Sequence, residues 1–156
     1  EGATVGRPHL ADALVANGVV ASRDEAFLDL LNNGSKYYVT HVAPTPEDAI
    51  RTIRRAGGVA VIAHPFASRR GQTNTAATFA DLVAAGMNGI EVHHRDQNAQ
   101  EQETLTAIAQ ELNLVITGSS DYHGTGKLNG LAENTTNQAQ WEQLESLANA
   151  RRVVKK

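Results

Sequence analysis

The feature that most constrains the fold is a regular alternation of helical and extended segments that begins at residue 45. The expected helices cover residues 46–56, 76–85 and 99–112, and the expected strands cover 59–63, 89–93 and 114–117. A last helix is expected over 138–150. Because helix–strand units follow one another three times, the pattern favours a parallel sheet with helices outside it. The first strand is apolar throughout, which suits a strand buried on both faces.

The first part of the chain does not follow this alternation. Two helices are expected there, over residues 7–17 and 23–33, and Ser22 with Glu25 forms a capping box for the second. We therefore expect an α/β fold with two parts. Residues 1–36 would form a small helical subdomain, and residues 37–156 would form the α/β part with about three parallel strands.

Composition excludes several classes of protein. The 156 residues include no cysteine, so neither a disulfide framework nor a thiolate metal site is available, which fits a reducing cytoplasm. No apolar run approaches the roughly 18 residues of a membrane span. The net charge is −3, whereas a protein that binds nucleic acid by bulk electrostatics is usually basic. Any phosphate recognition must therefore be local, through a metal or a few arginines.

Metal-binding side chains follow all three expected strands. The first strand ends in His64, the second in His93 and His94, and the third leads into Asp121 and His123. Since the carboxyl ends of parallel strands meet at one edge of a sheet, these side chains are expected on the same side. Imidazole nitrogen with carboxylate oxygen suits Zn²⁺, Mn²⁺ or Fe²⁺. The pattern predicts a divalent-metal site that could serve phosphate-ester hydrolysis.

Each of these residues also has a structural interpretation. An Asp-x-His pair is a weak signal alone, and His64 could be a buried histidine before the turn-forming Pro65. Adjacent strand residues face opposite sides, so at most one of His93 and His94 is expected to enter the site. We favour His93, because it shares a face with Glu91.

Arginines offer candidate phosphate contacts in two places. Arg7 opens the first helix, where the helix N-terminus favours anions and a guanidinium adds a fork of donors; a solvated helix cap is the alternative. Arg69 and Arg70 lie in the loop after His64, where they could contact a phosphate or be solvated.

The order of several motifs resembles the polymerase and histidinol phosphatase (PHP) superfamily, and within it the bacterial TrpH-like phosphoesterases. The matching segments are Gly6-Arg7-Pro8-His9-Leu10-Ala11, Tyr38-Val39, Gly57 to Pro65 with its Ala63-His64-Pro65, Gly89-Ile90-Glu91-Val92, and Gly118-Ser119-Ser120-Asp121-Tyr122-His123-Gly124. The resemblance extends to about residue 131. It implies a distorted (β/α)7 barrel with a helical insertion, and two or three divalent metals at the C-terminal face.

The resemblance also implies roles for individual residues. His64, Asp121 and His123 would be metal ligands, and Asp121 would also take or give a proton. Arg7 and His9, from the helical insertion, would bind the phosphate of the substrate. Apart from the resemblance, the strand pattern makes His93 a further candidate substrate contact. Hydrolysis by metal-activated water would act on phosphorylated small molecules, with nucleotides or short oligonucleotides as the first expectation.

One departure from the family is large. Its members begin with a His-x-His motif after the first strand and carry further ligands before the insertion, and none of these is present here. We therefore expect this chain to be the C-terminal portion of a longer enzyme, which would pair with the missing N-terminal portion or with a second copy.

Two other functions stay open. The chain alone could be a noncatalytic module that binds one metal or one phosphate. It could also belong to another class of metal-dependent hydrolase, such as an amidohydrolase, whose barrel also carries His and Asp at strand ends.

Overall fold

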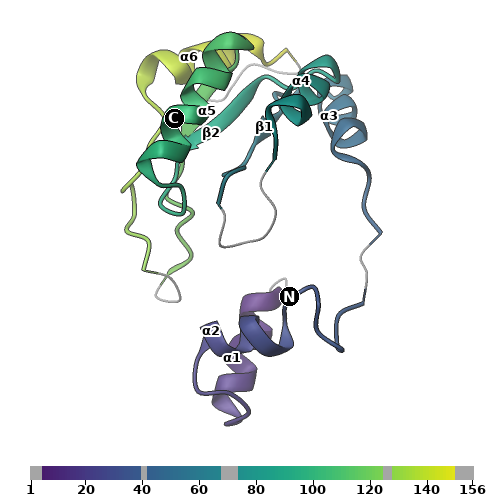
Figure 1. Cartoon of the computed structure of the whole chain (residues 1–156), viewed down its shortest axis with the longest axis vertical. Helices are drawn as coiled ribbons and strands as arrows, with labels where there is room; N and C mark the ends of the chain where they lie inside the picture. The colour runs from purple at the N-terminus through teal and green to yellow at the C-terminus, as the bar shows by residue number, and fades with distance from the viewer. Residues whose placement is uncertain (1–4, 40–41, 68–73, 125–127, 150–156) are drawn as a thin grey trace. The chain divides into compact units, whose positions relative to one another are not determined.

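The chain forms two compact units (Figure 1). The computed structural model describes residues 5–39, 42–67, 74–124 and 128–149, so Arg69 and Arg70 lie outside the described residues. The first unit is Glu1–Ala43 with Gly124–Leu128, and the second is Pro44–His123 with Asn129–Lys156. The first unit thus runs past the expected boundary at residue 36, and each unit has its own hydrophobic core.

The first unit is a small helical unit. It contains α1 (Arg7–Ala16), α2 (Arg23–Glu25) and a π-helical turn, η1 (Ala26–Leu30). Its buried residues are Ala11, Val20 and Ala26. The expected cap is present, because the N–H of Glu25 donates to the hydroxyl of Ser22 at 3.1 Å and the Glu25 carboxylate accepts from the N–H of Ala21.

The second helical segment is shorter than predicted, since it ends at Leu30 and not near residue 33. The amide of Asn32 donates to the carbonyl of Leu28, and the hydroxyl of Ser35 donates to the carbonyl of Leu30 at 2.7 Å. Side chains of this kind compete with the helical hydrogen bonds of the backbone, and they satisfy the last carbonyls here in place of another turn.

An ion pair between Asp12 and Arg23 gives the first unit a predictable response to acid. The guanidinium of Arg23 donates to the Asp12 carboxylate and lowers the pKa of that carboxyl below its ordinary value. A carboxyl whose pKa is lower in the folded state adds stability above its unfolded pKa, and that contribution is lost as pH falls through the folded pKa. Asp12→Asn should therefore reduce the protection of α1 amides from hydrogen exchange at pH 7, and the difference from the wild-type protein should shrink as pH falls through the pKa of the folded state. Equal protection of both proteins at pH 7 would contradict this.

The second unit carries the predicted sheet. Its helices are α3 (Pro46–Arg55), α4 (Ala76–Ala84), α5 (Ala99–Glu111) and α6 (Gln138–Leu147), and its strands are β1 (Val61–Ile62), β2 (Gly89–His93) and β3 (Val115–Gly118). The strands lie in the order β1-β2-β3 and all pairs are parallel, which confirms the prediction of three parallel strands. Within the described residues, none of the helices is both long and apolar enough to cross a membrane.

Side-chain caps begin all four of these helices. In each case the capping oxygen accepts the N–H three residues further on. The capping residues are Thr45, Thr75, Asn98 and Asn137.

The core of the second unit lies between the sheet and its helices. Helix α5 packs on β2, and α6 packs on β3 (Figure 1). Phe79 on α4, Ile90 and Val92 on β2, and Leu105 on α5 have no exposed surface. This packing holds the C-terminal ends of the three strands in fixed positions.

Strand β1 differs from its prediction in length and in burial. The ladder begins only at Val61, because the N–H of Ala60 donates to the side-chain oxygen of Asn88 at 3.1 Å and not to a strand. The side chain of Val61 is 37% exposed, so one face of β1 is open and not buried as expected.

The outer edge of β3 is covered by side chains. Its two outward N–H groups donate to the amide oxygen of Gln140, at 2.7 Å from Ile116, and to the hydroxyl of Thr136, at 3.1 Å from Gly118. Unpaired strand edges invite pairing with other strands, and these side chains occupy the donors that such pairing would use.

Candidate metal centre

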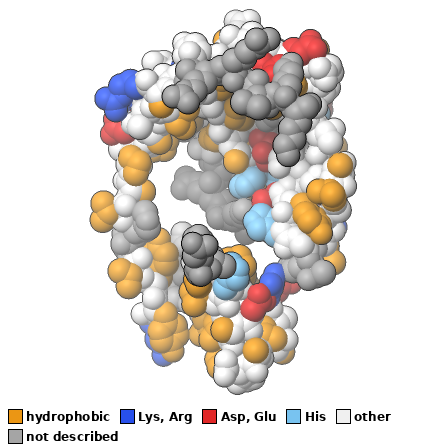
Figure 2. Space-filling view, turned by 180° about the vertical axis from the view of Figure 1, so that it is seen from behind, with side chains coloured by type: hydrophobic (Ala, Val, Ile, Leu, Met, Phe, Trp, Pro, Cys, Tyr) orange, Lys and Arg blue, Asp and Glu red, His pale blue; other side chains and the backbone are white. Residues whose placement is uncertain are grey.

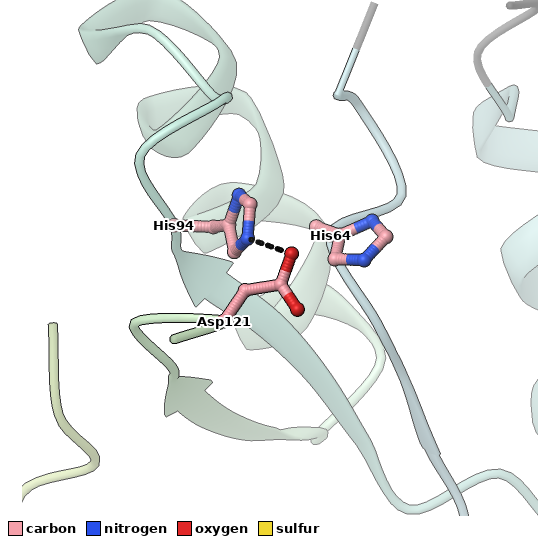
Figure 3. Close-up of side chains that lie close together, drawn as sticks. All are labelled: His64, His94 and Asp121. Atoms are coloured by element: carbon pink, nitrogen blue, oxygen red, sulfur yellow. Dashed lines mark ion pairs between the residues drawn. The ribbon is translucent and has the colours of Figure 1, made fainter. Parts of the chain in front are cut away.

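The three strands deliver three side chains to one point (Figure 3). His64 follows β1, His94 follows β2, and Asp121 follows β3. Because the strands are parallel, their C-terminal ends lie at the same edge of the sheet, where ligands usually bind in α/β folds. The close-up shows the carboxylate of Asp121 facing the imidazole of His94, with the imidazole of His64 next to them.

The distances within this group suit a shared ion. One ligand atom from each of His64, His94 and Asp121 lies within 4.8 Å of the others. The two imidazole rings have centroids 4.7 Å apart, and Nε2 of His94 lies 3.7 Å from Oδ2 of Asp121. His94 is fully buried, whereas the side chain of Asp121 is 20% exposed. The group is therefore sheltered on one side and open to small molecules on the other.

Two of these residues have an unusual backbone conformation. His64 has φ of 29° and Asp121 has φ of 47°. Positive φ is uncommon for residues with a β-carbon, and where the surrounding structure enforces it, the position is often functional. The two residues bring side chains from different strands to one place.

Hydrogen bonds hold the loop that presents Asp121. Its N–H donates to the hydroxyl of Ser119 at 3.1 Å. The hydroxyl of Ser120 donates to the carbonyl of Asn134 at 3.0 Å, and the amide of Asn129 donates to the carbonyl of Ser120 at 2.8 Å. These bonds use neighbouring groups and not the Asp121 carboxylate.

Gly118 allows this loop to pack closely against the end of β2. A β-carbon at residue 118 would lie 2.5 Å from the carbonyl oxygen of Thr135 and 2.9 Å from the β-carbon of His93. Neither distance is possible for a real side chain. A glycine is therefore required where β3 leads into the Asp121 loop.

The structure brings His94 into the group, and not the His93 that we favoured. The register of β2 against β3 shifts between Glu91 and His93, so the alternation of faces on which that preference rested does not continue to the strand end. His93 is exposed, with its Nδ1 3.3 Å from the side-chain oxygen of Gln102. A role for His93 as a substrate contact stays a prediction.

His123 lies beside the group and not within it. Its Nδ1 is 2.7 Å from the backbone carbonyl of Asp121 and 3.5 Å from Oδ1 of the same residue. A carbonyl only accepts, so Nδ1 carries the proton and the lone pair is on Nε2. Histidines that bind metals usually donate their other ring nitrogen to a carbonyl or carboxylate in this way. The arrangement fits the predicted ligand role of His123.

The donor set fits a divalent transition metal. His64 and Asp121 offer imidazole nitrogen and carboxylate oxygen within one group, and His123 offers a second imidazole beside it. Nitrogen and oxygen donors of this kind suit Zn²⁺, Mn²⁺ or Fe²⁺. Figure 2 shows histidine side chains next to acidic side chains on one face of the molecule.

A shallow groove adjoins the Asp121 loop. It is lined by Gly118 to His123 on one side and by Leu131, Ala132 and Asn134 to Thr136 on the other. The side chain of Tyr122 is half-exposed at this surface. The groove is open and partly polar, so it could accommodate part of a substrate whose phosphate lies near Asp121.

The predicted phosphate contacts of the first unit make local interactions. The guanidinium of Arg7 lies 5.8 Å from the centre of the Phe27 ring, and Nδ1 of His9 accepts the N–H of Gly6 at 2.9 Å. These contacts give His9 a capping role at the start of α1. Roles of Arg7 and His9 toward a substrate stay predictions.

Known proteins similar to this chain are named for phosphate-ester chemistry. Over 123 residues the chain is 34% identical to the 3′,5′-nucleoside bisphosphate phosphatase of Chromobacterium violaceum. This match covers 79% of the chain and 43% of that protein. It is 33% identical over 112 residues to the phosphoribosyl 1,2-cyclic phosphate 1,2-diphosphodiesterase of Eggerthella lenta (72% and 35%). It is 32% identical over 119 residues to the 5′-3′ exoribonuclease of Haemophilus influenzae (76% and 43%). The chain thus spans less than half the length of these relatives.

Solved structures share the fold. A crystal structure from Bifidobacterium adolescentis, assigned as a metal-dependent phosphoesterase, matches with a TM-score of 0.86 and 38% identity, over 93% of this chain and 51% of that one. A structure described as an amidohydrolase from Chromobacterium violaceum, with bound sulfate and no metal, matches with a TM-score of 0.72 and 32% identity (92% and 51%). No family model matches the chain.

Proposed function

We propose that the chain is the C-terminal portion of a metal-dependent phosphoesterase of the PHP superfamily, of the TrpH-like kind. Its substrates would be phosphate esters of nucleotides or short oligonucleotides. The observation that carries the proposal is the meeting of His64 and Asp121 at the C-terminal edge of the sheet, in a chain whose relatives are named phosphatase, diphosphodiesterase and exoribonuclease.

The three-stranded sheet would be part of a distorted (β/α)7 barrel. Val61 leaves one face of β1 open, which is where further strands of a barrel could pack. Those strands, and the remaining metal ligands, would come from an N-terminal portion or from a second copy of the chain. The chain covers less than half the length of its relatives, which supports a complete enzyme that is longer than this chain.

The residues of this chain would have different roles at the site. His64, Asp121 and His123 would hold Mn²⁺, Fe²⁺ or Zn²⁺, with two or three ions in the complete enzyme. When bound, such an ion lowers the pKa of water and neutralises charge on phosphate oxygens. Asp121 would also move a proton at its carboxylate, since its side chain is 20% exposed.

Arg7 provides a test of the phosphate contact. Because a guanidinium binds a phosphate in the ground state and in the transition state alike, Arg7→Ala should raise KM about tenfold or more with a smaller change in kcat. Metal content, measured on the same preparation, should not change. Arg51→Ala, an exposed arginine on α3 that pairs with Asp48, serves as the control. An unchanged KM in Arg7→Ala would return this residue to the role of a solvated helix cap.

The direct test is a side-by-side assay. Metal-replete protein would be offered a 3′,5′-nucleoside bisphosphate, a 5′-phosphorylated oligoribonucleotide and an amide substrate. It would be assayed as the 156-residue chain and, where that chain is part of a longer protein, as the whole protein. Release of phosphate or mononucleotide supports the proposal. Cleavage of the amide alone would favour the amidohydrolase function, for which the neighbour described as an amidohydrolase is the supporting observation.

A noncatalytic role for the chain alone is the second candidate. It is favoured by the small ligand set, since the metal-capable group found among the described residues consists of His64, His94 and Asp121. Turnover by the 156 residues alone would exclude it. Metal binding by the chain with turnover only in a longer protein would support it.

A further inference from the structure

His94 is held in one orientation by the turn that follows β2. The backbone N–H of Asp96 donates to Nδ1 of His94 at 3.1 Å, and the N–H of Gln97 donates to the carbonyl of His94, also at 3.1 Å. The amide of Gln97 donates to the carbonyl of Val92 at 2.7 Å, which ties the turn back to the strand. The imidazole is fully buried, so these contacts determine how it presents its second nitrogen.

These contacts determine which ring nitrogen carries the proton. A backbone N–H can only donate, so Nδ1 of His94 must present its lone pair to Asp96. In a neutral imidazole the proton is then on Nε2, and Nε2 is the nitrogen that lies 3.7 Å from Oδ2 of Asp121. A metal ligand needs the opposite state, with a lone pair on the nitrogen that faces the ion.

His123 shows the contrast within the same group. Its Nδ1 donates to the carbonyl of Asp121, which leaves the lone pair on Nε2. Asp121 thus lies between two imidazoles of opposite tautomers, with Oδ2 near Nε2 of His94 and Oδ1 3.5 Å from Nδ1 of His123. Proximity alone would count His94 among the ligands, whereas its hydrogen bond to Asp96 does not permit it.

We propose that His94 is a positioning residue that directs its Nε2–H at Oδ2 of Asp121, and is not a metal ligand. At 3.7 Å the Nε2–H faces Oδ2 without yet forming a hydrogen bond; in the metal-loaded site it would bind this oxygen and leave the other for an ion, as ligating carboxylates are usually held by hydrogen bonds from outside the ligand shell. The inference rests on the metal site proposed above. In this arrangement His64, Asp121 and His123 would bind the ion, and His94 would orient the carboxylate of Asp121.

The tautomers can be measured without any activity. Long-range ¹H–¹⁵N NMR spectra of metal-free protein labelled with ¹⁵N-histidine, at pH 8 and with signals assigned by single His→Gln variants, distinguish Nδ1–H from Nε2–H rings. We expect the Nε2–H form for His94 and the Nδ1–H form for His123. On addition of Zn²⁺, a ring nitrogen of His64 and of His123 should shift, while both nitrogens of His94 keep the signature of the Nε2–H form. An Nδ1–H tautomer for His94, or a zinc-induced shift of its ring nitrogens, would overturn the proposal.

Two substitutions separate a donor from a ligand. His94→Gln can place an amide N–H donor near the position of Nε2, whereas the shorter side chain of His94→Asn places its amide near the position of Nδ1 and does not reach that of Nε2. Loss of an outer partner lowers metal affinity by about 10-fold or more, so His94→Asn should show this loss in a Zn²⁺ titration and His94→Gln should recover most of it. Asparagine at the neighbouring exposed position, His93→Asn, should leave zinc affinity unchanged.

The outcomes distinguish this inference from the proposed function. Equal loss of zinc in His94→Gln and His94→Asn, to the level of His64→Asn, would make His94 a ligand and overturn the inference. Failure of the wild-type protein to bind zinc would overturn the proposed metal site, and the tautomer of His94 in metal-free protein would still decide its role.

Discussion

Asp121→Asn should abolish divalent-metal binding while leaving the fold of the second unit unchanged. The substitution keeps the shape of the side chain and removes the charge that an ion requires. Asparagine, like aspartate, tolerates the left-handed backbone that residue 121 adopts, with φ of 47°. Hydrogen bonds of Ser119 and Ser120, which the substitution does not touch, hold the loop. We expect metal affinity to fall by more than the roughly 10–100-fold that loss of an outer partner costs.

The measurement is a metal titration combined with thermal unfolding of the metal-free protein. Asp81→Asn, on the exposed side of α4, makes the same chemical change away from the site and should alter neither. If Asp121→Asn bound metal as tightly as the wild-type protein and instead unfolded at lower temperature without metal, Asp121 would be a structural residue.

Phe79→Ala should have the largest effect on stability. Phe79 is fully buried on α4 and packs edge-to-face against Phe66, with ring centroids 5.9 Å apart. Replacing a buried phenylalanine by alanine removes apolar contacts and leaves a cavity, which usually costs about 3–5 kcal/mol. Urea unfolding, followed by the cooperative loss of helical signal, measures this change. Leu131→Ala, at a side chain that is 78% exposed, should stay within about 0.5 kcal/mol of the wild-type protein.

The same substitution should also weaken the metal site. Phe66 follows His64 closely in the chain, and its N–H donates to the side-chain oxygen of Gln97 at 3.0 Å. A cavity beside Phe66 would therefore loosen the segment that presents His64. We expect lower metal affinity in Phe79→Ala at temperatures where the protein is still folded. If Phe79→Ala lost stability as expected but bound metal with unchanged affinity, the packing of α4 would not influence the position of His64.

The organisation of the second unit could be predicted because each of its signals is local. Alternating apolar residues mark β2 and an apolar run marks β3, and the cap at Thr45 marks a helix start by a short-range hydrogen bond. The edge of the sheet at which His64 and Asp121 meet follows from parallel pairing alone. For these elements, sequence pattern and structure depend on the same short-range physics.

The finer arrangement of the site depends on interactions that no local pattern reports. The choice between His93 and His94 depends on a register shift in β2, which arises from pairing with β3. The tautomer of His94 depends on a backbone N–H in the turn at Asp96, and that of His123 on a carbonyl in its own loop. The short ladder of β1 depends on the side chain of Asn88, 28 residues from its partner Ala60.

Hydrolysis of a 3′,5′-nucleoside bisphosphate with and without metal tests the central claim most directly. Protein treated with a chelator and then reloaded with Mn²⁺ or Zn²⁺ would be compared with Asp121→Asn handled in the same way. A phosphoesterase predicts phosphate release that disappears with the chelator, returns with the metal and is absent in Asp121→Asn. Metal-replete protein that leaves this substrate and a 5′-phosphorylated oligoribonucleotide intact, both as this chain and as any longer protein that contains it, would contradict the proposed function.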